Sequence, residues 1–246
     1  MQEELALTHF LNQLFGGMVT SLLNMLGVHP DHPGSPITNA FSVELVVVLL
    51  LVAFFVLVRA TLSVEKPGPP QQIAEMIHEF TGSMGEQIIG HGSEQYQAFV
   101  TCIFLFVLSN NLIGLIPGVP APTTSPAVPL GLAIPTFLYY NFQGFRSNGA
   151  GYVKQFFGPM PFWWMVWLLL LPIELVSHFA RIMSLTIRLY ANMFASDMLT
   201  LGFFSLIPIG VPAIFLGLHV FVSFIQAFIF MLLSMIYISL ATAHEH

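Results

Sequence analysis

Long hydrophobic runs, separated by short polar or proline-rich segments, make up most of the chain. Every run reaches the roughly 17–25 residues that a helix needs to cross the hydrocarbon core of a bilayer, which is about 30 Å thick. The runs cover residues 41–62, 99–116, 129–145, 162–201 and 212–241. This pattern predicts an all-α integral membrane protein with about five transmembrane helices.

Two of the segments outside these runs also have helical periodicity. Residues 5–28 are predicted to form an N-terminal interfacial helix, with a short span as the less favoured alternative. Residues 73–89 place their apolar side chains on one side, which indicates a helix at the interface or one leading into the next span. A proline-broken connector follows the first segment. We therefore divide the chain into an N-terminal segment, residues 1–40, and a single transmembrane helical domain, residues 41–246.

The last two apolar runs are unusually long. They are joined through residues 205–212, which contain two prolines and a glycine and are typical of a turn. If residues 162–201 form one helix, it is about 60 Å long, twice the thickness of the hydrocarbon core. Such a helix must tilt steeply, bend or run partly within the membrane plane. We therefore predict that the last two helices form a long, steeply tilted hairpin.

The composition agrees with a membrane protein and excludes several functions. Of the 246 residues, 56% are hydrophobic and 7% are charged, whereas a soluble domain has about 25% charged residues. The formal net charge is −6, and no stretch of the sequence is basic enough for nucleic acid. A single cysteine, Cys102, cannot form a disulfide or a thiolate metal site within the chain. His29 and His32 in the connector are predicted to face solvent, so we expect neither a metal nor a cofactor.

The basic residues outside the runs predict the orientation in the membrane. Arg59 and Lys66 share one loop, and Arg146 and Lys154 share another. Two spans separate these loops, so both lie on one side of the membrane, which the positive-inside rule makes cytoplasmic. We therefore expect the N-terminus outside and the C-terminus in the cytoplasm. This pattern, without a transit peptide, suits a bacterial inner membrane, with organelle encoding as the alternative.

A line of polar residues interrupts the longest apolar run. In a helix, Glu174, Arg181 and Arg188 fall within about 40° of one another on one face. An arginine near the centre of a membrane helix costs roughly 2.5–3.5 kcal/mol by insertion scales. The chain has only six Lys and Arg residues in total, and two of them lie in this line. Such an arrangement requires a functional reason.

A second set of polar residues lies on either side of the predicted turn. Asp197 follows Arg188 by nine residues, so it points to the opposite face of the same helix. Counted from the turn, Asp197 and His219 reach a similar depth near the outer surface. His219, Ser223 and Gln226 are spaced i, i+4 and i+7 and form one stripe on the last helix. An acid and an imidazole at one depth are groups that a proton relay can use.

These residues define two polar zones within the membrane, with Arg188 between them. The inner zone contains Glu174, Ser177, His178 and Ser184, and the outer zone contains Asn192, Asp197, His219 and Gln226. A guanidinium cannot pass protons on, but it can attract a carboxylate and favour its ionised form. Because no carboxylate of this chain lies at the depth of Arg188, we predict that its partner acid belongs to another subunit. The alternatives are a structural ion pair for Arg188, a structural or interfacial cation for Arg181 and a buried, satisfied histidine for His178.

Several segments resemble subunit a of the membrane sector of F-type ATP synthases. SLTIRLYANMFASDML, residues 184–199, is similar to the family's hallmark around its essential arginine. HVFVSFIQAFIFMLLSMIYIS, residues 219–239, is similar to its last helix. NNLIGLIPG resembles its second span, and PGPPQQIAEMIHEF resembles its amphipathic linker. The likeness covers roughly residues 40–241.

The resemblance implies roles for individual residues. The essential arginine of the family maps to Arg188, and the asparagine that follows it maps to Asn192. The acidic position maps to Asp197, and the outer-channel histidine and glutamine map to His219 and Gln226. Inner-channel positions map to Glu174 and Ser177, beside His178. The sequence departs from the family at Ala191 and Ser196, where glycine is frequent, and at Gly114, where some members have an acid. Asp197 is also shorter than the glutamate common in bacterial members.

The function implied by the resemblance is that of a stator. A c-ring would rotate against the tilted hairpin, and each proton would enter by an outer half-channel, protonate a ring carboxylate and leave by an inner half-channel. Arg188 would make the ring carboxylate release its proton and would block leakage between the half-channels. The chain would have no catalytic site of its own and no cofactor. The expected partners are the c-ring, subunit b of the peripheral stalk, the other ATP synthase subunits and the lipid bilayer.

Two other functions fit the apolar helices and the buried charges. A secondary transporter could use a buried arginine to bind an anionic substrate, but transporters often have internal repeats, and the two halves of this sequence show none. A purely structural subunit of a respiratory complex would not need an acid and a histidine at matching depth. Co-purification of a ring of small hairpin subunits would separate these functions from that of a stator.

Overall fold

Helices account for all the regular structure in the part of the chain that the computed structural model describes, which is residues 5–25, 27, 35–116, 118–149, 152, 164–206 and 211–242. The α-helices are α1 (Ala6–Met25), α2 (Asn39–Ala60), α3 (Pro69–Ile88), α4 (Glu94–Leu112), α5 (Ala127–Asn148), α7 (Trp164–Leu206) and α8 (Val211–Thr242). Two short 3-10 helices, η1 (Ile113–Leu115) and η2 (Pro122–Thr124), lie between α4 and α5. The predicted all-α fold is confirmed for these residues.

Each predicted membrane span corresponds to a helix in the structure. Among the described residues, three helical segments have the length and composition to cross a membrane, namely α2, α4 with η1, and α8. The most apolar is α2, with a mean hydropathy of 3.0. The other two predicted spans form α5, of 22 residues, and α7, of 43 residues. The amphipathic segment at residues 73–89 forms most of α3.

Local sequence explains where several helices begin and end. The Thr38 side chain accepts a hydrogen bond from the backbone N–H of Phe41 at 3.3 Å, which caps the start of α2. Pro69 opens α3, where its missing N–H removes no helical hydrogen bond. Gly149 follows the last residue of α5 with a φ of 54°, a left-handed conformation that glycine adopts readily.

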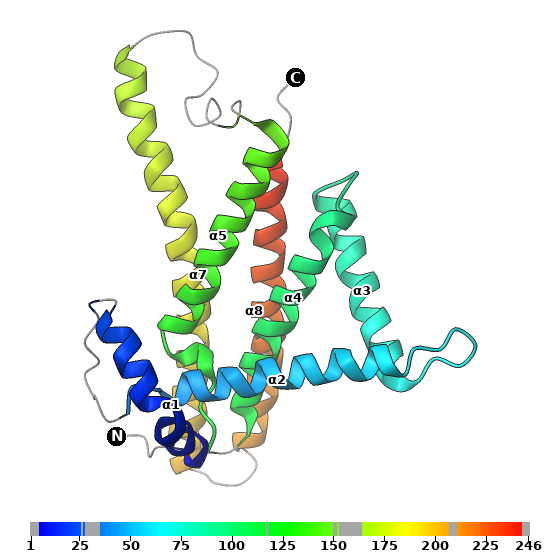
Figure 1. Cartoon of the computed structure of the whole chain (residues 1–246), viewed down its shortest axis with the longest axis vertical. Coiled ribbons are helices and arrows are strands. Elements are labelled where there is room, and N and C mark those ends of the chain that lie inside the picture. The colour runs from blue at the N-terminus through cyan, green and yellow to red at the C-terminus, as the bar shows by residue number, and fades with distance from the viewer. Residues whose placement is uncertain are drawn as a thin grey trace.

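The core of the bundle lies where α8 packs against α4, α5 and α7 (Figure 1). The buried apolar residues of α8 recur with helical spacing, so one continuous stripe faces the other helices. Small residues at the contacts, such as Ala133 and Ala227, are completely buried and let the helices approach closely. The main core side chains from α4, α5, α7 and α8 are Val100, Val107, Tyr140, Leu189, Met193, Met231, Met235 and Ile238.

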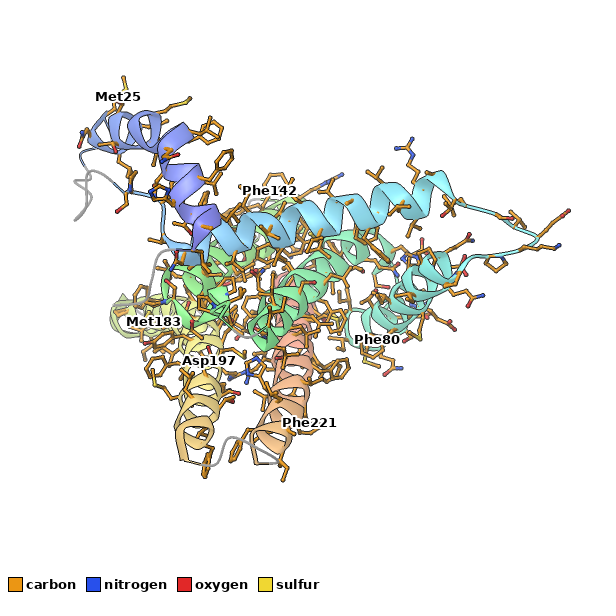
Figure 2. All side chains as sticks on the ribbon, turned by 90° about the horizontal axis from the view of Figure 1, so that it is seen from below. Met25, Phe80, Phe142, Met183, Asp197 and Phe221 are labelled. Carbon is orange, nitrogen blue, oxygen red and sulfur yellow. The ribbon has the colours of Figure 1, made fainter. Side chains whose placement is uncertain are left out.

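The direction of α2 differs strongly from that of α7 and α8. Both Figure 1 and Figure 2 show α2 crossing these two helices at a steep angle. With 22 residues, α2 is about 33 Å long and matches the hydrocarbon thickness, whereas the 43 residues of α7 make about 65 Å. If α2 crosses the bilayer directly, α7 and α8 cannot do the same. This geometry agrees with the predicted long, steeply tilted hairpin.

The N-terminal helix α1 is attached to the start of α2. Asn12 donates from its amide to the Ile37 carbonyl at 3.1 Å and accepts from the Ile37 N–H at 2.9 Å. Asn39 accepts a further hydrogen bond from the Leu5 N–H at 3.2 Å. α1 also exposes several large apolar side chains, among them Phe10 and Met18. Such a face is suited to a membrane interface.

Candidate functional site

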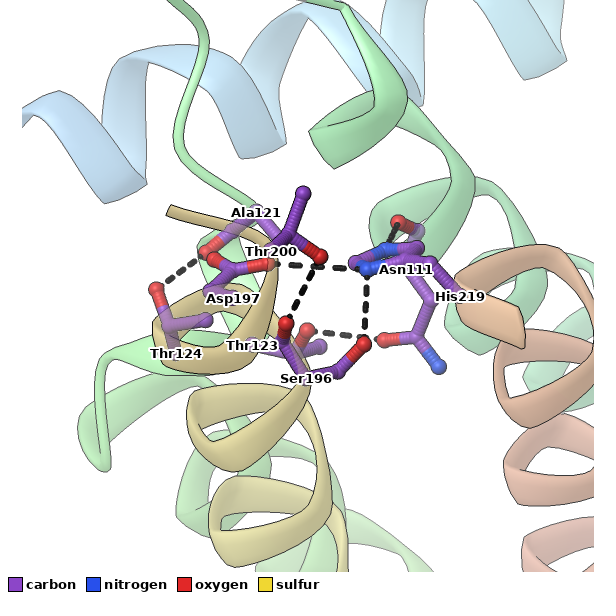
Figure 3. A network of polar contacts seen from close by, with 8 residues as sticks. All are labelled: Asn111, Ala121, Thr123, Thr124, Ser196, Asp197, Thr200 and His219. Atoms are coloured by element: carbon purple, nitrogen blue, oxygen red, sulfur yellow. Dashed lines mark hydrogen bonds and ion pairs between the residues drawn. The ribbon is translucent and has the colours of Figure 1, made fainter. Parts of the chain in front are cut away.

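Five residues from four helices, α4, η2, α7 and α8, form the group that we call the acid–histidine cluster: Asn111, Thr123, Ser196, Asp197 and His219. His219 on α8 is 2% exposed. Its Nδ1 atom lies 3.6 Å from Oδ1 of Asp197 and 3.0 Å from Oγ of Ser196, both on α7 (Figure 3). Figure 2 shows Asp197 on the side of α7 that faces α8. The structure thus brings together the acid and the imidazole that the sequence places at similar depth.

The hydrogen bonds of His219 determine where its protons lie. Nε2 is 3.1 Å from the backbone carbonyl of Asn111. A carbonyl can only accept, so in this contact Nε2 carries the hydrogen. In the neutral ring Nδ1 then accepts from the Ser196 hydroxyl, and in the protonated ring Nδ1–H can pair with Asp197. His219 can therefore bind and release a proton at Nδ1 while its contact with Asn111 is kept.

The segment after α4 fixes the Asn111 side of the cluster. Thr123 in η2 donates from its hydroxyl to Oδ1 of Asn111 at 2.7 Å, and Thr124 donates to the Ala121 carbonyl at 2.7 Å. Gly114 and Ala121 approach so closely that a Cβ at position 114 would lie 2.7 Å from the Ala121 Cβ. This close approach leaves no room for a side chain at position 114 unless the Ala121 segment shifts.

The buried polar residues continue along the contact between α4 and α8. Ser223 is fully buried and Gln226 is 5% exposed, and both lie on the His219 stripe of α8. Among the described residues, Asn110 Oδ1, Asn111 Nδ2 and Ser223 Oγ are buried without a hydrogen-bond partner in the protein. A buried polar atom of this kind costs about 1–3 kcal/mol, and internal water is its usual partner. The interior beside His219 is therefore polar on both helices.

Arg188 lies on a different face of α7 from this cluster. It is half-buried, and its Nη2 donates to the Ser184 hydroxyl one turn earlier at 3.4 Å. No carboxylate of the described residues pairs with it. Asn192, one turn later, is exposed on the same face. Ile187, the residue before Arg188, is also exposed. The structure does not bring Arg188 to Asp197, since nine residues along α7 correspond to about 14 Å and opposite faces. No hydrogen bond among the described residues joins Asn192 to Asp197, and Asn192 belongs to the Arg188 face.

A second polar group, which we call the tyrosine–histidine cluster, comprises Tyr140, His178, Arg181 and Tyr237. The Tyr140 hydroxyl on α5 lies 3.2 Å from Nδ1 of His178 on α7. The guanidinium carbon of Arg181 lies 5.1 Å from the centre of the Tyr237 ring on α8, and the Tyr140 and Tyr237 rings are 5.7 Å apart. Arg181 thus makes a cation–π contact across the helix interface.

The remaining predicted residues of the inner zone are close to this cluster in sequence. Ser177 is half-buried and directly precedes His178. Glu174 belongs to α7, but its side chain lies outside the described residues. Sequence reasoning missed Tyr140, because an aromatic residue in an apolar run resembles ordinary core packing. It also missed the hydrogen bond of Ser196, which it treated only as a small residue.

Comparison with known proteins gives a consistent family assignment. Residues 40–239 match the family described as "ATP synthase A chain". The protein named "ATP synthase subunit a" of Koribacter versatilis is 52% identical over 247 aligned residues, covering all of both chains. The protein of the same name from Solibacter usitatus is 46% identical over 96% of this chain and 99% of the relative. A third, from Bdellovibrio bacteriovorus, is 42% identical over 71% of this chain and 75% of the relative.

Proposed function

The chain belongs to the ATP synthase subunit a family, and on that premise we propose that it provides two proton half-channels that meet a c-ring at Arg188. Members of this family are proton-translocating subunits in the membrane sector of the synthase. The chain therefore acts with other ATP synthase subunits in a membrane. The half-channels, the role of the arginine and the ring contact are the parts that we propose.

In the outer half-channel, protons reach the acid–histidine cluster and are exchanged at Nδ1 of His219. Asp197 stabilises the protonated ring, and Gln226 and Asn192 extend the polar route toward the ring-facing side. The unsatisfied buried atoms of Asn111 and Ser223 support this route, because internal water is the usual partner of such atoms and protons can travel along water. The inner half-channel uses Glu174, Ser177 and His178.

Arg188 faces the c-ring from the exposed side of α7. The observation that carries the proposal is a half-buried guanidinium among exposed apolar side chains, with Ser184 as its hydrogen-bond partner and no described carboxylate beside it. A cation in such surroundings is expensive within a membrane. A carboxylate on the ring would offset that cost, and Arg188 would favour its ionised form. Because guanidinium does not release its proton, Arg188 also separates the two half-channels.

The orientation and the remaining partners follow from the same proposal. The N-terminus lies outside and the C-terminus in the cytoplasm of a bacterium, with the chain in the inner membrane. Subunit b of the peripheral stalk holds the chain against rotation. The chain has no catalytic site of its own and binds no cofactor, since it only moves protons between groups that it already contains or faces.

The test is ATP-driven acidification of inverted membrane vesicles that contain the assembled complex. We expect Arg188→Ala to abolish pumping while the other subunits stay bound to the membrane. Vesicles stripped of the catalytic head should keep some passive proton permeability. Arg146→Ala, at the end of α5, is the control for loss of a cation and should pump normally. Normal pumping by Arg188→Ala would contradict the proposal and would direct attention to anion transport.

A further inference from the structure

The tyrosine–histidine cluster contains a contact that no role assigned so far explains. Tyr140 is 2% exposed and His178 is 7% exposed. Besides the 3.2 Å contact between the hydroxyl and Nδ1, their rings lie 6.3 Å apart at an interplanar angle of 21°. Phe137, one turn earlier on α5, meets the His178 ring edge-on at 6.0 Å and 82°. Two rings of α5 therefore hold the imidazole of His178 in one orientation.

The neighbouring tyrosine shows that this contact is specific to position 140. Tyr139 is directed differently, because it stacks on Phe99 of α4 with ring centres 3.7 Å apart. A buried hydroxyl needs a hydrogen-bond partner, and Tyr140 finds one in the imidazole. Tyr140 and Tyr139 thus form a natural pair for comparison, with the same side chain, adjacent positions and different surroundings.

We infer that Tyr140 is a positioning residue for proton transfer through His178. This inference rests on the proposed role of His178 in the inner half-channel. When the imidazole is neutral, the Tyr140 hydroxyl donates to Nδ1 and the ring proton is held at Nε2. When the imidazole is protonated, Nδ1–H donates to the same hydroxyl oxygen, since a phenol can both donate and accept. Tyr140 therefore keeps the ring in place in both protonation states.

A permanent cation also belongs to the tyrosine–histidine cluster. The described titratable and charged groups that face this region are Tyr140 from α5, Arg181 from α7 and Tyr237 from α8. Arg181 keeps its charge and lies over the Tyr237 ring, 5.1 Å from its centre. The Tyr140 hydroxyl contacts Nδ1 of His178 directly, so it keeps this atom oriented for each transfer.

The experiment compares Tyr140→Phe with Tyr139→Phe in the assembled complex. Passive proton flux is measured in head-stripped vesicles as a function of the pH on the cytoplasmic side. Loss of one orienting hydrogen bond should slow Tyr140→Phe by about fivefold and change its pH dependence, while Tyr139→Phe should behave as the wild type. In a His178→Asn background, Tyr140→Phe should have no further effect.

Two results would overturn the inference. One is a wild-type rate and pH dependence for Tyr140→Phe, and the other is an equal reduction by Tyr140→Phe with or without His178, which would indicate packing alone. If His178→Asn abolishes flux, the pH dependence of Tyr140→Phe decides by itself. ATP-driven pumping by Arg188→Ala in vesicles that keep the catalytic head separates the two proposals: if pumping stops there and Tyr140→Phe has no effect on passive flux, only the role of Tyr140 is wrong.

Discussion

The acid–histidine cluster and the tyrosine–histidine cluster share one contact in different surroundings. In both, a hydroxyl oxygen meets Nδ1 of a buried histidine, at 3.0 Å from Ser196 to His219 and at 3.2 Å from Tyr140 to His178. Around His219 the neighbours are a carboxylate and a backbone carbonyl, whereas around His178 they are aromatic rings and a guanidinium. The first set therefore offers His219 a carboxylate partner, whereas His178 contacts a hydroxyl and aromatic rings.

This difference gives the two ends of the proposed path different tasks. A carboxylate beside an imidazole helps to capture a proton that arrives from water. At the other imidazole, the Tyr140 hydroxyl and the Phe137 ring hold the side chain in one orientation for a proton that arrives from the ring. Arg188 lies between them, about 14 Å along α7 from Asp197 and about 15 Å from His178. Neither cluster can therefore neutralise Arg188, which leaves it available to a partner.

Among the substitutions that test this comparison, Asp197→Asn should have the largest effect on ATP-driven pumping. The change keeps the shape of the side chain and removes the only described carboxylate in either cluster. Because proton transfer by a positioned acid or base contributes about 10²–10⁴-fold, we expect ATP-driven pumping to fall by about a hundredfold. Asp197→Glu keeps the charge and should retain most of the rate. Pumping by Asp197→Asn within twofold of the wild type would show that the carboxylate is not needed for capture.

The sequence alone predicted the helices well because their determinants are local. Apolar runs and turn residues placed each span within a few residues of its helix, including α7 as one continuous helix. The approach of Asp197 to His219 was also accessible, since both positions can be counted from the same turn. These features depend on periodicity and chain length, which a sequence contains directly.

The partners of the two histidines could not be predicted in the same way. Asn111 reaches His219 through its backbone carbonyl, a group that every residue has, so side-chain identity carries no signal. Ser196 differs from other small residues only through the neighbour that packing brings to it. Tyr140 comes from another helix, 38 positions before His178, and only the three-dimensional arrangement selects it over Tyr139.

Ser196→Ala should have a smaller effect on ATP-driven pumping. It tests whether the Ser196–His219 contact is equivalent to the Tyr140–His178 contact. The change removes the donor to Nδ1 of His219 and leaves Asp197 in place. We expect pumping to fall by about fivefold, as for Tyr140→Phe, because each variant loses one orienting hydrogen bond. Thr186→Val is the control, since the Thr186 hydroxyl donates to the Ile182 carbonyl within α7 and belongs to neither cluster. A wild-type rate for Ser196→Ala would show that Asp197 alone positions His219.

The smallest effect on pumping should come from Gly114→Ala. This change acts on the acid–histidine cluster indirectly, through the segment that carries Thr123. The new Cβ would lie 2.7 Å from the Ala121 Cβ and 3.3 Å from Ala121 backbone atoms, so the segment that carries Thr123 must shift. Overpacking of this kind typically costs about 1–3 kcal/mol, and thermal unfolding of the complex in detergent should occur at a lower temperature.

Gly131→Ala is the matched control for Gly114→Ala, because nothing lies within 4 Å of a Cβ built at Gly131 in α5. Alanine is favoured over glycine in a helix by about 1 kcal/mol, so Gly131→Ala should unfold at the same or a higher temperature. If Gly114→Ala were as stable as this control and pumped normally, the segment after α4 would be more adaptable than its close packing indicates. The position of Asn111 would then depend on α4 and His219 alone, and the acid–histidine cluster would be no better supported than the tyrosine–histidine cluster.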